Sequence, residues 1–115
     1  MKAPQTRHRV FAYGTLLSPF RQKKLFGRLI PWAPAVLSGW RRKRCVGPYF
    51  GIVRDRGSRT EGGLLLLTRE QFAAADRWER MPWLYRRRRV RVTSSGRRVV
   101  CWVYVPARPS ASRKL

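Results

Sequence analysis

The sequence predicts a single α+β domain in which a small mixed sheet curls into a partial barrel, with two short helices beside it. Three observations lead to this fold class. The 115 residues, 43% of them hydrophobic, suffice for one domain with a buried core. Short apolar runs bounded by Gly, Pro and Ser outnumber the helical patterns, so strands predominate. Two segments begin with a helix-capping pattern.

The first predicted elements are a strand, a turn and a short helix. Residues 10–13 form an apolar run that stops at Gly14, which indicates a strand entering a tight turn. Ser18 is followed by proline, and this pair predicts a helix N-cap with proline at the first helical position. The helix is expected to cover residues 19–26 and to end at Gly27.

Five further strands are predicted after this helix. Three are apolar runs separated by turns, at residues 35–40, 50–53 and 63–67. Turns are expected at Gly47-Pro48 and at Gly57-Ser58, where glycine and its neighbours favour chain reversal. The last two strands, residues 84–92 and 97–105, are joined by Thr93-Ser-Ser-Gly96, a sequence typical of a hairpin.

A second helix is predicted before the hairpin. Thr68 and Gln71 form a capping-box pattern, in which a hydroxyl is followed three residues later by an amide. The helix is expected to extend to about Arg80, because Met81-Pro82 ends it.

The two ends of the chain differ in composition from the middle. Residues 1–9 and 106–115 are polar and basic, so we expect them to be mobile and residues 10–105 to form the domain. No apolar run reaches the ~18 residues of a membrane span, and the N-terminus resembles no signal peptide. A cytoplasmic location is therefore expected.

Positive charge dominates the composition. Lys and Arg number 27 against 5 Asp and Glu, which gives a net charge of +22. Such a charge favours contact with a polyanion such as nucleic acid, but it does not identify the partner. With one histidine, and with Cys45 and Cys101 far apart, the sequence predicts no metal site and no disulfide framework. The two cysteines are expected to be buried.

Among the five acidic residues, Glu79 has the most informative position. It follows Phe72 by seven residues on the second predicted helix, which places the two side chains roughly 20° apart around the axis. Glu79 therefore projects towards the body of the domain, where an unpaired carboxylate is costly. Two interpretations stay open, an ion pair to Arg86 or Arg87 and a catalytic or ligand-binding acid. Asp76 is expected to fix the following loop.

The turn after the first strand is the second candidate site. Tyr13-Gly14-Thr15-Leu16 leads from a strand into a helix start, and this geometry presents backbone N–H groups in a concave arrangement. The helix dipole adds partial positive charge, so a carboxylate or phosphate is a suitable ligand. Many such junctions bind nothing, so the turn alone does not establish a site.

Together these features resemble the γ-glutamylcyclotransferase-like superfamily, in its short γ-glutamylamine cyclotransferase branch. Residues 10–17, Val-Phe-Ala-Tyr-Gly-Thr-Leu-Leu, are similar to the opening YGTL signature of that family. The resemblance covers about residues 10–105. Its further motifs lie at residues 35–40, 49–53, 61–62, 76–79, 85–87 and 102–105.

The resemblance implies an enzyme that needs neither metal nor cofactor. Such enzymes cleave a γ-glutamyl amine or peptide by attack of its own α-amino group on the γ-carbonyl, which releases 5-oxoproline. Glu79 matches the general acid/base of the family. The residues that match its substrate loop are Tyr13, Gly14, Thr15 and Leu16. Tyr85 and Tyr104 are weaker candidates for hydroxyls at the pocket, because each could equally pack in the sheet.

The basic run over residues 86–91 suggests a function of another class. Strand alternation places Arg87, Arg89 and Arg91 on the face of Tyr85, and Arg86 and Arg88 on the opposite face. This run either protects a sheet edge or, with residues 41–44 and the aromatics Trp40 and Trp83, binds phosphate groups. The alternative function is therefore a non-catalytic basic module that binds nucleic acid or another polyanion. The oligomeric state cannot be read from the sequence.

Overall fold

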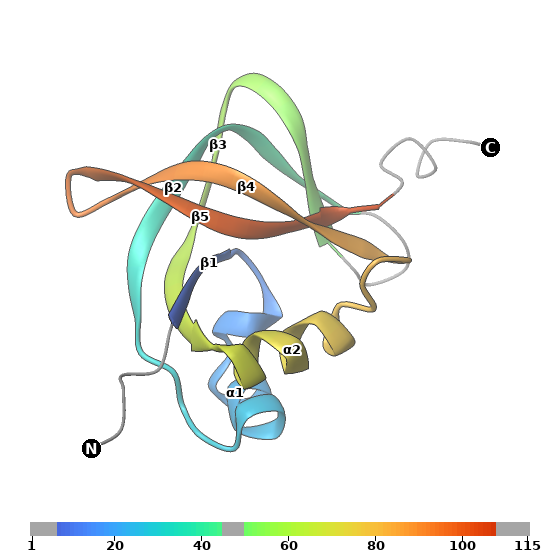
Figure 1. Cartoon of the computed structure of the whole chain (residues 1–115). Helices are drawn as coiled ribbons and strands as arrows, with labels where there is room; N and C mark the ends of the chain where they lie inside the picture. Colours follow the sequence, from blue (N-terminus) through green and yellow to red (C-terminus); the bar gives the residue numbers. More distant parts are fainter. Residues whose placement is uncertain (1–6, 45–49, 108–115) are drawn as a thin grey trace.

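The computed structural model describes residues 7–44 and 50–107. Figure 1 shows a ring of strongly curved strands, with the helices gathered at one end of it. The elements in chain order are β1 (Arg7–Ala12), the single 3₁₀ turn η1 (Thr15–Leu17), α1 (Pro19–Phe26), β2 (Trp32–Arg44), β3 (Phe50–Thr68), α2 (Arg69–Trp78), β4 (Tyr85–Ser94) and β5 (Arg97–Pro106). The predicted α+β class, with a curled mixed sheet and two short helices, is confirmed.

The strands follow one another around the ring in the order β1-β3-β2-β4-β5, and β5 returns to β1. All neighbouring pairs are antiparallel except β1 and β5, which are parallel. Few residue pairs close the ring. β1 pairs with β5 at Val10↔Trp102 and Phe11↔Val103, and β2 pairs with β4 at Val36↔Thr93. The ring is therefore held mainly by the long β2–β3 and β4–β5 pairs.

The central strands are longer than the sequence predicts. Residues 50–53 and 63–67 were expected as separate strands with a turn at Gly57-Ser58, whereas β3 is continuous from Phe50 to Thr68. The two strands β2 and β3 pair on both sides of the predicted turn, from Trp32↔Leu65 to Ser38↔Arg59 and from Trp40↔Arg54 to Arg44↔Phe50, with a register shift between the two stretches. Residues 55–58 fall in this shift and have no backbone pairing partner in β2, and Gly57, with a φ of 92°, bends the strand there without ending it.

Smaller differences lie at the ends of the elements. Residues 7–9 were expected in a mobile terminal segment, but they belong to β1, where Arg7 pairs with Thr68. The second helix was expected to reach Arg80, but α2 ends at Trp78, because Arg80 adopts a left-handed φ of 54°. The β4–β5 hairpin turns at Ser95-Gly96, both with positive φ, as a tight hairpin requires.

Both helix starts confirm the sequence prediction. Ser18 caps α1 by accepting a hydrogen bond from the Arg21 N–H at 3.4 Å. The capping box of α2 is complete, because Thr68 Oγ1 accepts from the Gln71 N–H at 3.1 Å and Gln71 Oε1 accepts from the Thr68 N–H at 2.9 Å. Neither helix of the described residues is long and apolar enough to cross a membrane.

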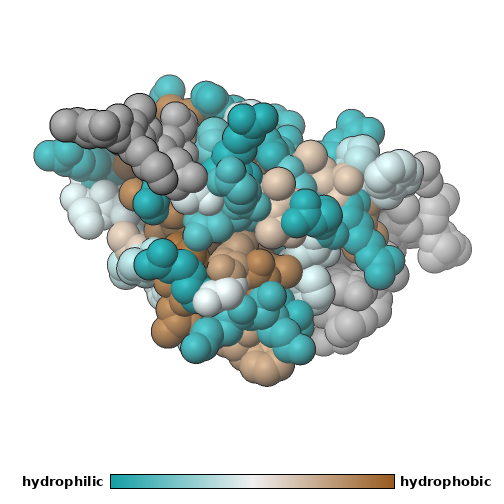
Figure 2. Space-filling view, turned by 60° about the horizontal axis from the view of Figure 1, so that its bottom comes forward, coloured by the Kyte–Doolittle hydropathy of each residue, from teal (hydrophilic) through white to brown (hydrophobic). Residues whose placement is uncertain are grey.

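Two hydrophobic clusters form the core, one inside the ring and one between the sheet and the helices. Alternation along β1 supplies both, because Phe11 and Tyr13 point into the ring while Val10 and Ala12 face the helices. Cys101 is buried in the ring, as expected, and Cys45 lies outside the described residues. Viewed from the helical end, the surface is largely hydrophilic with hydrophobic patches between the polar side chains (Figure 2).

Replacing Gly62 by alanine should destabilise the sheet. A methyl group at Gly62 would lie 2.2 Å from the backbone oxygen of Ala12 and 2.8 Å from the Phe11 ring. Overpacking of this kind lowers the free energy of unfolding by about 1–3 kcal/mol. Chemical denaturation of the Gly62→Ala variant measures this loss, and an unchanged midpoint would contradict the close approach of β1 and β3.

Candidate active site

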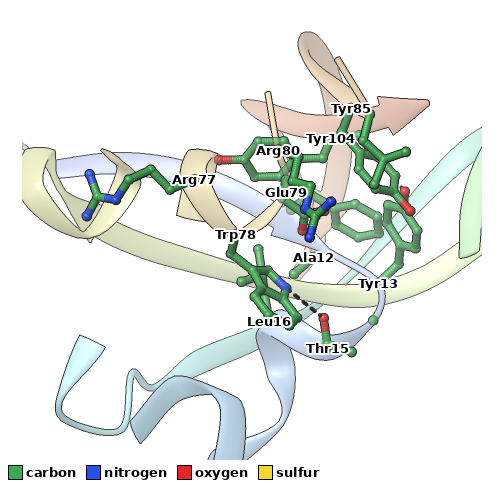
Figure 3. Close-up of a pocket in the computed structure, with 13 residues that line it drawn as sticks. Ala12, Tyr13, Thr15, Leu16, Arg77, Trp78, Glu79, Arg80, Tyr85 and Tyr104 are labelled. Carbon is green, nitrogen blue, oxygen red and sulfur yellow. Dashed lines mark hydrogen bonds between the residues drawn. The ribbon is translucent and has the colours of Figure 1, made fainter. Parts of the chain in front are cut away.

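A pocket of about 340 Å³ lies where β1 leaves the ring and α2 ends (Figure 3). It is bounded by the turn after β1, the last residues of α2, and the adjoining parts of β4 and β5. The structure brings all of the predicted site residues to this one pocket: Glu79, Tyr13, Gly14, Thr15, Leu16, Tyr85 and Tyr104. Residues from positions 13 to 104 of the chain therefore share one cavity.

Glu79 occupies the C-cap position of α2, where its backbone N–H donates to the Ala75 carbonyl at 2.9 Å. Among the described residues, its side-chain carboxyl has no hydrogen-bond or ion-pair partner. Burial, and to a lesser extent the negative charge of Asp76, raises the pKa of Glu79 from 4.5 to about 7. The pocket therefore holds a carboxyl group that exchanges protons near neutral pH.

The ion pair considered for Glu79 is formed by Asp76 instead. Arg87 Nε donates to Asp76 Oδ1 at 3.0 Å, and a second guanidinium nitrogen of Arg87 donates to Oδ2. The Tyr104 hydroxyl donates to Oδ1 at 2.5 Å. The guanidinium carbon of Arg87 also lies 3.7 Å from the Phe72 ring centroid. Among the residues that the structure describes, neither Arg86 nor Arg87 forms an ion pair with Glu79.

This Asp76 cluster changes two expectations. Asp76 was expected to fix the following loop, and its backbone oxygen does accept from the Met81 N–H at 3.0 Å. Its side chain, however, ties α2 to β4 and β5. Tyr104 lines the pocket, but its hydroxyl is engaged by Asp76, and burial raises the pKa of that hydroxyl above its usual value. The cluster therefore positions the end of α2 against the sheet.

Contacts on both sides hold the predicted substrate turn. The Tyr13 hydroxyl donates to the backbone oxygen of Tyr104 at 2.8 Å, and Arg42 donates to the backbone oxygen of Tyr13. Gly14 then leads into η1, whose first N–H groups lack acceptors within so short a helix. Trp78 Nε1 donates to Thr15 Oγ1 at 3.4 Å, which links the turn to α2 (Figure 3).

Sequence reasoning missed the residues that support this turn. Buried Gln22 donates from Nε2 to the Leu16 carbonyl at 2.9 Å, and its Oε1 accepts from the Ile30 N–H at 2.8 Å. The only signal for Gln22 was an uncharged polar residue on a short amphipathic helix. Pocket-lining residues outside the prediction are Phe11, Ala12, Arg77, Trp78, Arg80 and Leu84. Of these, Arg77 extends away from the group around Glu79 (Figure 3).

The predicted phosphate-binding residues do not all share one surface. Arg87 is held by Asp76, and Arg41 Nε donates to Asp55 Oδ2 at 2.8 Å. Trp40 is buried, with 8% of its surface exposed, so its ring cannot stack on a nucleotide. Among the described residues, no group of three or more His, Cys, Asp or Glu side chains could hold a metal ion.

A ring of five strands, an acid-bearing helix end and a glycine turn therefore surround one pocket. Comparison with known proteins gives the family. The chain belongs to the gamma-glutamyl cyclotransferase, AIG2-like family, whose sequence model matches residues 10–115. The superfamily resemblance drawn from the motifs is thereby confirmed. No curated protein sequence matches the chain.

Solved structures support the same fold. A protein of Arabidopsis thaliana matches at 26% identity with a TM-score of 0.83, covering 98% of this chain and 70% of its own. A gamma-glutamyl cyclotransferase matches at 17% identity and TM-score 0.75, covering 87% of this chain and 66% of its own. An AIG2-like protein of Mus musculus matches at 18% identity with a TM-score of 0.72, covering 89% of this chain and 78% of its own. Because the last two proteins are less than 25% identical to this chain, their likeness to it shows the fold alone.

Proposed function

We propose that this protein is a γ-glutamylcyclotransferase that releases 5-oxoproline from a γ-glutamyl amine or peptide. The observation that carries the proposal is the shared pocket. An ion-pair-free Glu79 carboxyl with a pKa of about 7 borders the same cavity as the Tyr13–Leu16 turn. A general acid/base is most effective when its pKa lies near the working pH, because both of its protonation states are then accessible.

The proposed reaction starts with the Glu79 carboxylate accepting a proton from the substrate α-ammonium group. The neutral amine attacks the γ-carbonyl carbon, and the new C–N bond closes a five-membered ring. Backbone N–H groups of the turn stabilise the negative oxygen of the tetrahedral intermediate and hold the α-carboxylate. Glu79 then gives its proton to the leaving nitrogen, the old C–N bond breaks, and 5-oxoproline and a free amine remain. The second proton lost by the ammonium group goes to water.

The small cavity contributes through proximity. At about 340 Å³ it is near the lower end of the range of ligand pockets, which suits a substrate folded back on itself. Holding the amine against the carbonyl makes the attack intramolecular in a fixed geometry, which lowers the barrier. The aromatic side chains of Tyr13, Trp78 and Tyr85 would limit the volume open to water.

The test is an assay of 5-oxoproline release from a panel of γ-glutamyl amines and γ-glutamyl dipeptides. The Glu79→Gln variant should lose about 10²–10⁴-fold in kcat, because glutamine cannot carry the proton. For the wild type, kcat/KM should rise with pH and level off above about pH 7, as Glu79 becomes ionised.

Glu70→Gln is the matched control. Glu70 is an exposed acid in the first turn of the same helix, and the substitution is chemically identical. This variant should keep wild-type activity. Equal product traces from wild type and Glu79→Gln would overturn the role of Glu79, and no turnover of any substrate in the panel would overturn the proposed function.

A further inference from the structure

A cationic surface separate from the proposed active site follows the start of β1. Two hollows, of about 650 and 470 Å³, lie side by side there and share Arg7, Arg9 and Leu66. The first also includes Arg28 from the segment after α1, Trp32 at the start of β2, and parts of β3. The second reaches β5 and is bounded by residues that include Arg89, Val100 and Trp102. We call the two together the β1 groove.

The topology of the ring explains why this groove is open. The parallel pairing of β1 with β5 begins at Val10, so Arg7, His8 and Arg9 extend beyond it. On their other side these residues pair with β3, which fixes them in place. The extended backbone therefore presents the side chains of residues 7–9 at a gap between strands, in a rigid arrangement.

The four arginines of the β1 groove carry uncompensated charge. Arg7, Arg9, Arg28 and Arg89 are exposed, and none of them is paired with a carboxylate of the described residues. All five acidic side chains of the chain lie in the described part, and none of them lines either hollow. A groove with cations on both sides and no acid concentrates anions.

Aromatic and apolar groups alternate with these charges. Trp32 has 46% of its surface exposed, and Leu66 has 50%. The guanidinium carbon of Arg89 lies 4.7 Å from the Trp102 ring centroid. Arginines neutralise phosphates, while exposed indole rings offer faces for stacking, and both together are characteristic of surfaces that bind unpaired nucleotides. An acidic peptide would use the charges but would gain nothing from stacking.

We propose that the β1 groove binds single-stranded nucleic acid, with Arg7, Arg9, Arg28 and Arg89 on the phosphates and Trp32 stacked on a base. Unpaired bases are required, because bases in a duplex do not present their faces to a side chain. This site is independent of the proposed catalytic pocket, since the two share no lining residue.

Fluorescence anisotropy with a labelled twelve-nucleotide oligothymidylate tests the proposal. Four phosphate contacts predict a slope of about −3 in a plot of log K against log salt concentration. The double variant Arg7→Gln/Arg9→Gln should bind roughly tenfold more weakly and should reduce that slope by about half. Trp32→Ala should weaken binding about tenfold, whereas Trp32→Phe should retain most of it.

The matched control is Arg56→Gln/Arg59→Gln, which removes the same charge from exposed positions of β3 outside both hollows. It should leave binding within about threefold of the wild type, as should Glu79→Gln. Equal losses from the two arginine pairs would overturn the groove, because binding would then depend on total charge. Displacement by polyglutamate as effective as by unlabelled oligothymidylate would also overturn it and would indicate an acidic-protein partner. Absence of binding at low salt would exclude the site altogether.

Discussion

The Glu79→Gln variant is expected to be more stable than the wild type above pH 7, although it loses the proposed activity. Burial raises the pKa of Glu79 to about 7 in the folded protein, while the unfolded chain keeps a value near 4.5. Below pH 4.5 the group is protonated in both states and has no effect. As the pH rises from 4.5 to 7, Glu79 ionises first in the unfolded state, which lowers the free energy of unfolding. The full loss is present above pH 7.

The neutral glutamine amide removes this loss. From pH 4.5 to pH 7, at about 1.4 kcal/mol for each pH unit, the gain in the free energy of unfolding amounts to at most about 3–4 kcal/mol at pH 8. Thermal denaturation at pH 4 and pH 8 measures it, with equal melting temperatures at pH 4 and a higher one for the variant at pH 8. Glu70→Gln should change stability by less than about 1 kcal/mol, because its carboxylate is exposed near a helix N-terminus. A variant destabilised at pH 8 would show that Glu79 is stabilised by contacts as a carboxylate.

The Asp76→Ala variant is expected to lose about 3 kcal/mol of stability. In the wild type, the Asp76 carboxylate accepts hydrogen bonds from two guanidinium nitrogens of Arg87 and from the Tyr104 hydroxyl. Only 18% of the Asp76 side chain and 30% of the Arg87 side chain are exposed, so the partners left behind are poorly compensated by water. The loss is measured by chemical denaturation at pH 7.

Asp55→Ala is the matched control for Asp76→Ala. Asp55 also pairs with an arginine, Arg41, but 38% of the Asp55 side chain and 53% of the Arg41 side chain are exposed, so water and salt screen the pair and Asp55→Ala should cost much less stability than Asp76→Ala. Equal losses from the two variants would indicate that only net charge matters. Asp76→Ala should also lower the pH at which activity levels off, because one of the two causes of the raised pKa of Glu79 disappears.

The helices of this protein could be predicted because their signals are local. Ser18 and Thr68 cap the two helix starts with side chains that reach backbone N–H groups three residues away. Gly27 ends α1 with a φ of 74°, which glycine adopts without strain. The local turn signal Gly57-Ser58 does lie where β3 loses its pairing with β2, but the pairing resumes on both sides, at Ser38↔Arg59 and Trp40↔Arg54, and the strand is continuous. The sequence therefore predicted two strands where one is present.

The candidate site could be predicted in part for the same reason. Helical periodicity alone indicated that Glu79 points inward, and the turn at Gly14 was visible as a strand end before a helix start. The partner of Arg87 could not be predicted, since Asp76 and Glu79 lie less than one helical turn apart. Which of these two acids meets the arginine depends on where β4 passes α2. Gln22 was missed because its role depends on two backbone groups, at Leu16 and Ile30, that only the folded chain brings together.

The amino-acid sequence by itself determined the capped helices, the hairpin, the two candidate site segments and their resemblance to one family, because each depends on contacts between near neighbours or on a motif. Tertiary structure decided which charges are neutralised. Asp76 is paired and Glu79 is left in a cavity because the ring closes β5 onto β1 and sets β4 and β5 against one side of α2. The same closure leaves Arg7 and Arg9 beyond the part of β1 that pairs with β5. Electrostatic partners are chosen by distance in space, and that distance depends on how strands far apart in the sequence are paired.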